Sequence, residues 1–280
     1  MGIRIEKEGA MKKWLIPIIL LLLLILPLTR IVPSVGIMSL NNLYHKRSAL
    51  TQDKNIELDF PVGRVSENQN WFPMMLTFNA SEDFSRYFGR EIDLTILYNF
   101  GAYKFGKSYS SFYDEESPYF GAFYGAYLVE DSNNPHGFGI LENGKTDSEL
   151  LFNIAKYDYT RLVLSGLGAK LTDVKFEQVL IGESIRSIVG YDDWIQIDAV
   201  VKTNGPIHAP SKFQVSYLQY GYPPKYGGEN FPEVDMHSRV WTRRFPEKSV
   251  TIVFYVMTPD LEFLNDMSER LIYETNVTLN

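Results

Sequence analysis

An apolar run near the start of the chain constrains where everything after it can fold. Residues 14–28 have the sequence WLIPIILLLLLILPL and contain no charged side chain. A helix of this length spans roughly 22 Å at 1.5 Å per residue, short of a hydrocarbon core about 30 Å thick. The long side chain of Arg30 can reach lipid headgroups, so Ile31 and Val32 can extend the buried stretch. We therefore expect a transmembrane segment at residues 14–32.

The flanks of this run bear on whether it is an anchor or a removable signal peptide. A signal peptidase site needs small residues soon after the apolar stretch. Pro27, Arg30 and Pro33 occupy that region instead, and no small-x-small pattern follows closely. These flanks favour an uncleaved signal anchor, with a cleaved peptide as the alternative. A buried core helix is disfavoured because the run has no polar face at any period.

Positive charges predict the orientation of the anchor. Basic residues lie mostly before the run, with Arg4, Lys7, Lys12 and Lys13 preceding it and Arg30 following closely. The more basic side of a membrane segment stays in the cytoplasm. Residues 1–13 are therefore expected to be a cytoplasmic n-region, residues 33–52 an external tether, and residues 53–280 an extracytoplasmic domain. The expected location is the bacterial plasma membrane, with lipid contacted through residues 14–32.

Composition limits the possible partners of that domain. The 280 residues are 45% hydrophobic, enough to form a substantial core. The formal net charge of −7 disfavours nucleic acid, because phosphate binding needs an excess of Lys and Arg on some face. The lack of cysteine excludes disulfides, thiol nucleophiles and zinc–thiolate sites. No phosphate-binding or dinucleotide fingerprint occurs, so no cofactor is expected.

Alternation of apolar and polar residues predicts a β-rich outer domain. Strands are expected at residues 56–60, 72–78, 92–100, 119–129, 185–189, 195–201, 213–217 and 250–256. The pattern at residues 250–256 is that of a half-buried strand, and residues 190–193 are expected to form a hairpin turn. Helices are predicted at 81–89, at 147–164 with Thr146 in a capping box, and after Thr258 and Pro259.

These elements predict the fold class. Strands mixed with two or three helices, without regular alternation of the two, indicate an α+β fold with a mixed or antiparallel sheet. The polar, turn-rich stretch near residues 130–146 either separates two subdomains or interrupts one continuous sheet.

Two short segments repeat a Phe-Gly-Ala-aromatic pattern in a stretch rich in Tyr, Phe and Gly. They are Phe100-Gly-Ala-Tyr103 and Phe120-Gly-Ala-Phe123. Glycine beside aromatic residues can open a flat apolar shelf on which a sugar ring or a peptide stacks. Glycine in a strand is also often covered by a neighbouring ring without any ligand. Phe100, Tyr103, Phe120 and Phe123 are thus candidate ligand-binding residues, with structural packing as the favoured interpretation.

Three potential metal ligands occur at alternate positions near the C-terminal end of the chain. Glu233, Asp235 and His237 would share one face if their segment were extended, and carboxylate–imidazole mixtures suit zinc, manganese or iron. The proline and glycine residues between 223 and 232 instead predict a loop, where alternation has no such meaning. Solvated loop charge is the favoured interpretation, and a metal site is the alternative.

Three functions remain open from the sequence. No Gly-x-Ser-x-Gly motif occurs, and the four histidines lie in no recognisable triad pattern. The preferred hypothesis is a non-enzymatic, membrane-tethered envelope domain that binds, senses or assembles with an envelope protein or glycan. The second is an anchored hydrolase of envelope glycan or peptide that uses carboxylates or residues 233–237. The third is a cleaved, secreted protein.

Overall fold

The computed structural model describes most of residues 53–280 and part of the segment before them. The described residues are 40–59, 64–66, 69–70, 74–79, 82–99, 122–157, 175–203 and 233–280, together with Pro17 and Leu21. Apart from Pro17 and Leu21, the expected anchor at residues 14–32 lies outside this set, as does the strand expected at residues 213–217. Within the part of the chain that is described, no helix has the length and apolarity needed to cross a bilayer.

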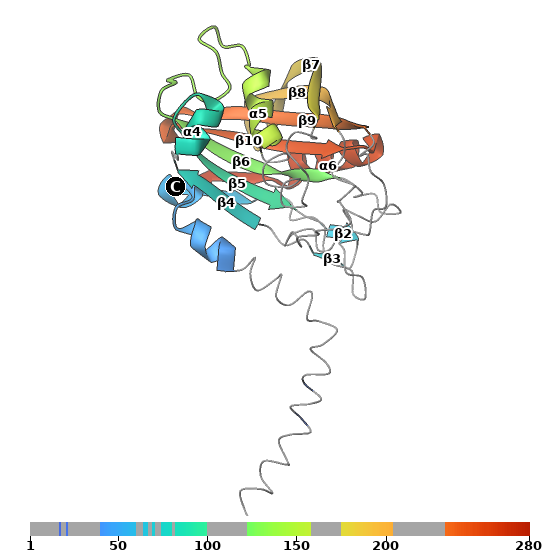
Figure 1. Ribbon diagram of the computed structural model, residues 1–280, viewed down its shortest axis with the longest axis horizontal. Coiled ribbons are helices and arrows are strands. Elements are labelled where there is room, and N and C mark those ends of the chain that lie inside the picture. Colours follow the sequence, from blue (N-terminus) through green and yellow to red (C-terminus); the bar gives the residue numbers. More distant parts are fainter. Residues whose placement is uncertain are drawn as a thin grey trace, which may run out of the picture.

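One seven-stranded sheet forms the centre of the described chain (Figure 1). Its strands, in spatial order, are β4 (Met74–Asn79), β5 (Ile92–Asn99), β6 (Phe123–Asp131), β10 (Val250–Thr258), β9 (Val234–Phe245), β8 (Tyr191–Thr203) and β7 (Phe176–Ile188). Two small sheets pair β1 (Ile56–Asp59) with β11 (Asn276–Leu279) and β2 (Arg64–Ser66) with β3 (Gln69–Asn70). All pairings among the described strands are antiparallel.

Within the described ranges, helices are few and short. They are α3 (Leu50–Asp53), α4 (Glu82–Phe88), α5 (Ser148–Tyr157) and α6 (Leu261–Glu274), with a 3₁₀ turn, η5 (Pro246–Lys248). Residues 40–46 are also helical. Few helices around an antiparallel sheet confirm the predicted α+β class.

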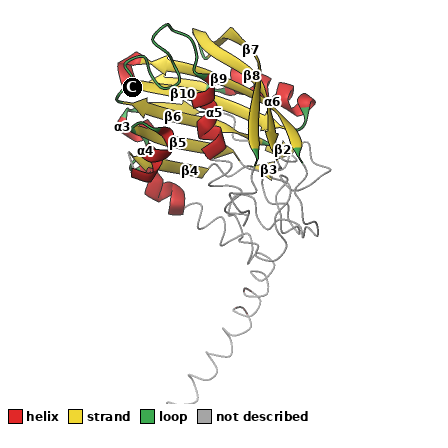
Figure 2. Cartoon of the chain, turned by 45° about the horizontal axis from the view of Figure 1, so that its top comes forward, coloured by secondary structure: helices red, strands yellow, loops and turns green. Residues whose placement is uncertain are grey.

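Helices cover both faces of the sheet. Side chains three positions apart on a strand point to opposite faces. Tyr127 of β6 donates its hydroxyl to the backbone oxygen of Leu151 in α5 at 2.9 Å, whereas Tyr124 of the same strand packs against Phe263 of α6. The sheet therefore lies between α5 and α6, with β4 and β7 at its two ends (Figure 2).

This layering explains why β10 differs from its predicted pattern. We expected a half-buried strand at residues 250–256, but every residue of β10 is buried. The strand lies between β6 and β9 in the middle of the sheet, and both faces there are covered. Apolar side chains at successive positions, such as Val253 and Phe254, fit a strand that is buried on both sides.

The hairpin between β7 and β8 turns earlier than predicted. Val189 and Gly190 have φ values of 56° and 76°, which is the backbone of a two-residue type I′ turn. Tyr191 already begins β8, so Asp192 and Asp193 lie in the strand and not in the turn. Asp193 accepts a hydrogen bond from Arg243 Nε at 2.5 Å on the neighbouring strand.

The helix caps also differ from the prediction by one or two residues. Asp147, not Thr146, caps α5 by accepting a hydrogen bond at 3.0 Å from a backbone N–H of its first turn. Thr146 instead donates its hydroxyl to Glu183 of β7 at 3.0 Å. Asp260 caps α6, and Thr258, the expected cap, accepts the backbone N–H of Asp260 at 3.1 Å. In each helix, an aspartate one or two residues after the expected hydroxyl residue takes the capping position.

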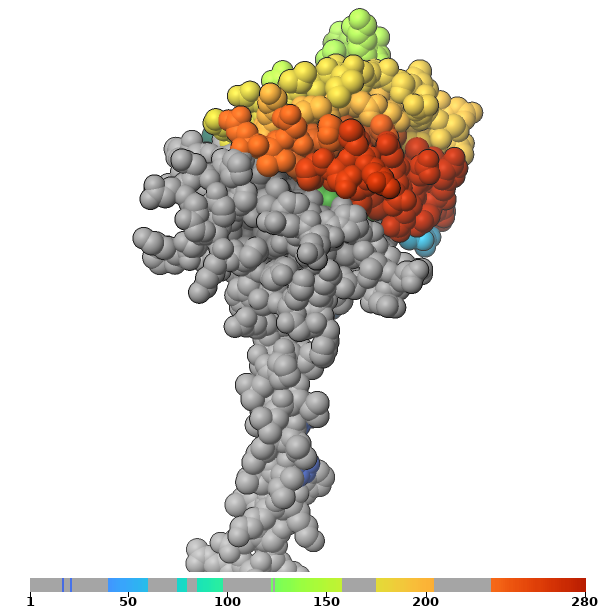
Figure 3. All heavy atoms as spheres, turned by 90° about the vertical axis from the view of Figure 1, so that its right-hand side faces the viewer, coloured from blue at the N-terminus to red at the C-terminus, as the bar shows by residue number. Residues whose placement is uncertain are grey.

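The two ends of the sheet differ in what covers them. At the β4 end, residues 40–46 and α3, which the sequence places in the tether, contact the sheet: Asn41 Nδ2 donates to Met75 O at 3.0 Å. The backbone N–H of Leu50 donates to Thr95 Oγ1 at 2.8 Å. At the other end, the residues of β7 and β8 lie at the molecular surface along the top of Figure 3. Most of the stretch at residues 130–146 connects β6, a strand of this sheet, with α5, which contacts the same sheet through the Tyr127–Leu151 hydrogen bond.

Candidate functional site

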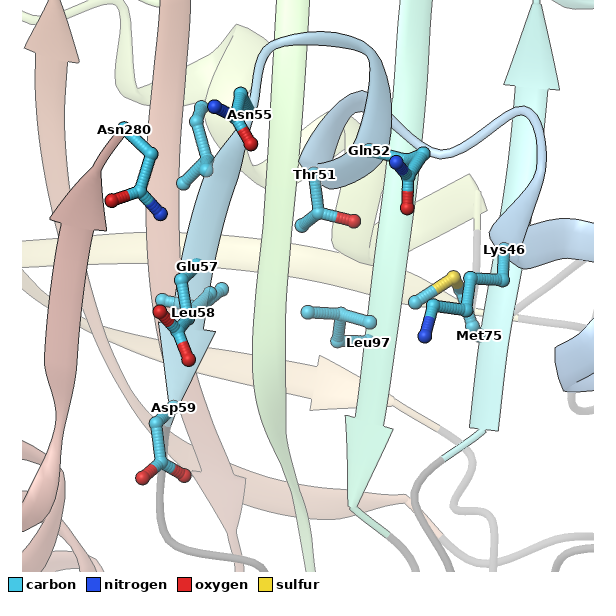
Figure 4. Close-up of a pocket in the computed structure, with 11 residues that line it drawn as sticks. Lys46, Thr51, Gln52, Asn55, Glu57, Leu58, Asp59, Met75, Leu97 and Asn280 are labelled. Carbon is cyan, nitrogen blue, oxygen red and sulfur yellow. The ribbon is translucent and has the colours of Figure 1, made fainter.

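A cleft of about 500 Å³ opens between α3, β1 and the outer strands β4 and β5 (Figure 4). Its walls consist of Lys46, Thr51, Gln52, Asn55, Ile56, Glu57, Leu58, Asp59, Met75, Leu97 and Asn280. A cavity of this size lies within the range of small-molecule and short-peptide sites. Apolar side chains form its floor and polar side chains its rim, the usual composition of a binding site.

The floor is formed by strand residues that face the same side. Met75 of β4 and Leu97 of β5 are direct partners in the ladder, so their side chains project from the same face of the sheet. Ile56 and Leu58 of β1 line the cleft above that face. Leu97 is buried, whereas Met75 and Leu58 are half-buried and reach the open space.

Amide and hydroxyl groups line the upper part of the cleft. Thr51 and Gln52 come from α3, and Asn55 follows in the turn that leads into β1. Asn55 has a φ of 53°, a left-handed conformation that asparagine tolerates better than most residues. The backbone N–H of Asn280 donates to Asn55 O at 3.1 Å, which holds the last residue of the chain against this turn.

Charges of opposite sign lie on opposite sides of the cleft. In Figure 4, Lys46 lies beside Met75. Glu57 and Asp59 lie on β1, on the other side of Leu97 from Lys46. All three charged residues are exposed. A ligand in the cleft would therefore meet a cation at one side and two carboxylates at the other, which would set its direction.

His45 attaches the helical segment that carries Lys46 to β4. Its Nδ1 accepts the backbone N–H of Thr77 at 3.1 Å and lies 2.9 Å from Thr77 Oγ1. Ser48 Oγ lies 2.9 Å from the same Thr77 hydroxyl. Because Nδ1 is an acceptor here, the neutral ring is the form that fits. Burial lowers the pKa of His45, which also favours the neutral ring.

We expect this attachment to weaken in mild acid. The pKa of His45 is lower in the folded chain than its ordinary value of about 6.5. The neutral ring therefore stabilises the folded state above that ordinary value, and the contribution is lost as the pH falls through the lowered pKa. In an NMR titration the ring should titrate below pH 6.5, and the Thr77 amide should lose exchange protection over the same range. The variant His45→Gln should abolish this pH dependence, and equal protection of Thr77 across the titration would contradict it.

The candidate metal ligands do not converge. Glu233 precedes β9 and pairs with Lys175, whose hydrogen bond and charge hold the pKa of that carboxyl below its usual range. Asp235 lies opposite Lys202, and His237 lies between β8 and β10 in the ladder. The segment from residue 234 onward is a strand and not the expected loop. Among the described residues, no group of three or more His, Asp or Glu could hold a metal ion.

Only one of the four aromatic residues expected to form a shelf lies among the described residues. Phe123 begins β6, whereas Phe100, Tyr103 and Phe120 lie outside the described residues. A similar segment that starts with tyrosine, Tyr124-Gly-Ala-Tyr127, continues directly along β6. A Cβ added to Gly125 in this segment would lie 2.2 Å from Leu97 O and 3.0 Å from the Tyr255 hydroxyl. In this segment the glycine is therefore required by close packing of strands.

The side chains that line the cleft offer several kinds of polar contact. Its amides, hydroxyl and separated charges can form hydrogen bonds and ion pairs with a ligand. The sequence carried no signal for this site, because its residues come from segments as distant as Lys46, Leu97 and Asn280.

Comparison with protein-family models, with curated proteins and with solved structures finds no match for this chain.

Proposed function

We propose that this chain is a membrane-anchored binding protein of the bacterial envelope. Its outer domain would take a short peptide segment of an envelope partner in the cleft between α3, β1 and β5. The observation that carries the proposal is the open apolar floor of Leu58, Met75 and Leu97 beneath a polar rim.

The rim favours a peptide as the ligand. A peptide backbone offers alternating donors and acceptors, which match the amides of Gln52, Asn55 and Asn280. Apolar side chains of the peptide would contact the floor, and its charged side chains would meet Lys46 or the two carboxylates of β1. A glycan would use the same amides, but would leave the apolar floor less well covered.

The distance from the expected anchor favours a ligand near the membrane. Residues 33–39 separate the expected anchor from the helical residues 40–46, and seven residues reach at most roughly 25 Å when extended. Lys46, which borders the cleft, is therefore tied close to the bilayer if residues 14–32 span it.

The topology is tested first. A periplasmic-type reporter fused after Asn280 should be active outside the cytoplasm, and the full chain should remain with the membrane in alkaline carbonate. Reporter activity in the cytosol alone would refute the anchor and its orientation. Mass measurement of the mature N-terminus distinguishes an intact anchor from a cleaved, secreted form.

The cleft is tested with the full chain in mild detergent against an array of short peptides. We expect binding of peptides that carry apolar residues. The variant Leu58→Arg should weaken that binding about tenfold or more, because it places a charge on the apolar floor. The matched control Leu261→Arg, at a residue of α6 that is 54% exposed, should bind as the unmodified chain does. Equal binding by both variants, with unchanged thermal unfolding, would refute the cleft as the site.

A further inference from the structure

The outer edge of the sheet is formed by a long and unusually apolar strand. β7 is the last strand of the seven, with β8 on one side and no further strand among the described residues on the other. Four of its apolar side chains are more than half exposed: Val179 (56%), Leu180 (51%), Ile181 (66%) and Ile185 (72%). A long exposed edge of this kind offers unpaired backbone groups to another strand. Figure 3 shows this part of the molecule at the surface.

A β-bulge lies at the middle of this strand. Leu180 is opposite Ala199, and Gly182 is opposite Asp198, so Ile181 is an extra residue in β7. An extra residue reverses which side chains face which side of the sheet. As a result, Glu177 before the bulge and Arg186 after it lie on the same face, although their numbers differ in parity.

We propose that β7 pairs with β7 of a second copy of this chain, antiparallel, about a two-fold axis between Ile181 and Gly182. The two seven-stranded sheets would then form one continuous sheet. In this register Glu177 lies opposite Arg186 of the other copy, and Val179 lies opposite Ser184. Each pair joins side chains of the same face, as an antiparallel ladder requires.

Charge selects this register. Two unlike charge pairs are conceivable in β7, Glu177 with Arg186 and Glu183 with Arg186. The second pair comes from one side of the bulge and would place its members on opposite faces, so it cannot form. Within its own chain, Glu183 accepts the hydroxyl of Thr146 at 3.0 Å, and Arg186 Nε donates to Gln196 Oε1 at 3.1 Å. The Glu177–Arg186 pair forms twice because of the two-fold symmetry, and opposite charges across a ladder are stabilising.

The position of the bulge is compatible with this pairing. A bulge on an edge strand usually limits pairing by interrupting the ladder. Here it coincides with the two-fold axis, so the ladder on each side of the axis is regular. The apolar side chains of Leu180 and Ile181 lie next to the axis, where those of the second copy can cover them.

Charge exchange tests the pairing. The full chain in mild detergent is examined by sedimentation velocity over a range of concentrations, and a dimer is expected. Glu177→Arg and Arg186→Glu should each raise the dimer dissociation constant about tenfold or more, since each places like charges opposite one another twice. The double variant should return it to within about threefold of the original. Glu247→Arg, the same charge change at an exposed residue of η5, should have no effect. A monomeric chain, or a double variant as weak as the single ones, would overturn the proposal.

Cross-linking tests the position of the axis. The chain has no cysteine, so a single introduced thiol can be followed without interference. Ile181→Cys should form a disulfide-linked dimer on mild oxidation, because two copies of this residue lie beside the axis. Glu247→Cys should show no disulfide-linked dimer on a non-reducing gel after the same oxidation. Efficient cross-linking at residue 247 and none at residue 181 would refute the register.

Discussion

Replacing Trp194 with alanine is expected to lower the free energy of unfolding by about 3–5 kcal/mol. Trp194 is fully buried, stacks on Phe254 of β10 at a ring-centroid distance of 5.0 Å and meets the edge of Phe245 at 6.1 Å. Its removal leaves a cavity beside Phe254 and Phe245, which neighbouring side chains can fill only in part. Urea titration of the full chain in mild detergent, followed by near-ultraviolet circular dichroism, measures the change.

Two further variants control for this result. Tyr273→Ala removes an aromatic ring that is 83% exposed, and should change the stability by less than about 0.5 kcal/mol. Trp194→Phe keeps a ring against Phe254 and should cost less than the alanine variant. A loss for Trp194→Ala no larger than that for Tyr273→Ala would contradict the packing described.

Gly125→Ala is expected to cost about 1–3 kcal/mol or more, measured in the same way. The added methyl group would lie 2.2 Å from the backbone oxygen of Leu97 in β5, a separation that real carbon atoms do not reach. The ladder between β5 and β6 must shift to admit it, and backbone yields less readily than a flexible side chain. The floor of the cleft includes Leu97, so the peptide binding that we propose should weaken as well.

Gly182→Ala is the matched control for this prediction. Gly182 lies in β7 of the same sheet, and a Cβ added there would meet no atom within 4 Å. At concentrations where the chain is monomeric, the variant should be neutral or slightly stabilising, because alanine reduces the freedom of the unfolded chain. Equal losses at residues 125 and 182 would show that close approach of β5 and β6 is not the cause.

The candidate site depended on tertiary structure far more than the fold did. Lys46 lies within residues 33–52, which we expected to form an external tether, yet the preceding residue, His45, is half-buried against Thr77. No spacing along the chain relates Lys46 to Leu97 or to Asn280. Residues that meet only because separate strands and helices pack together leave no periodic pattern in the sequence.

The sequence by itself determined the elements whose signals are local. Alternation predicted β4 and β5, because it reflects which side of one strand is buried, and capping residues predicted the starts of α5 and α6. The α+β class followed from their order. The cap and turn positions were displaced by one or two residues, since neighbouring hydroxyls, carboxylates and glycines compete for them.

Tertiary structure decided what depends on neighbours distant in sequence. The segment at residues 234–245 became the strand β9 because β8 and β10 supply hydrogen-bonding partners on both sides. β10 is buried on both faces because α5 and α6 lie on opposite sides of the sheet. β1 pairs with β11, which brings Asn280 beside Asn55 and completes the cleft. A strand's partners and burial are set by the whole folded chain, so no local pattern can specify them.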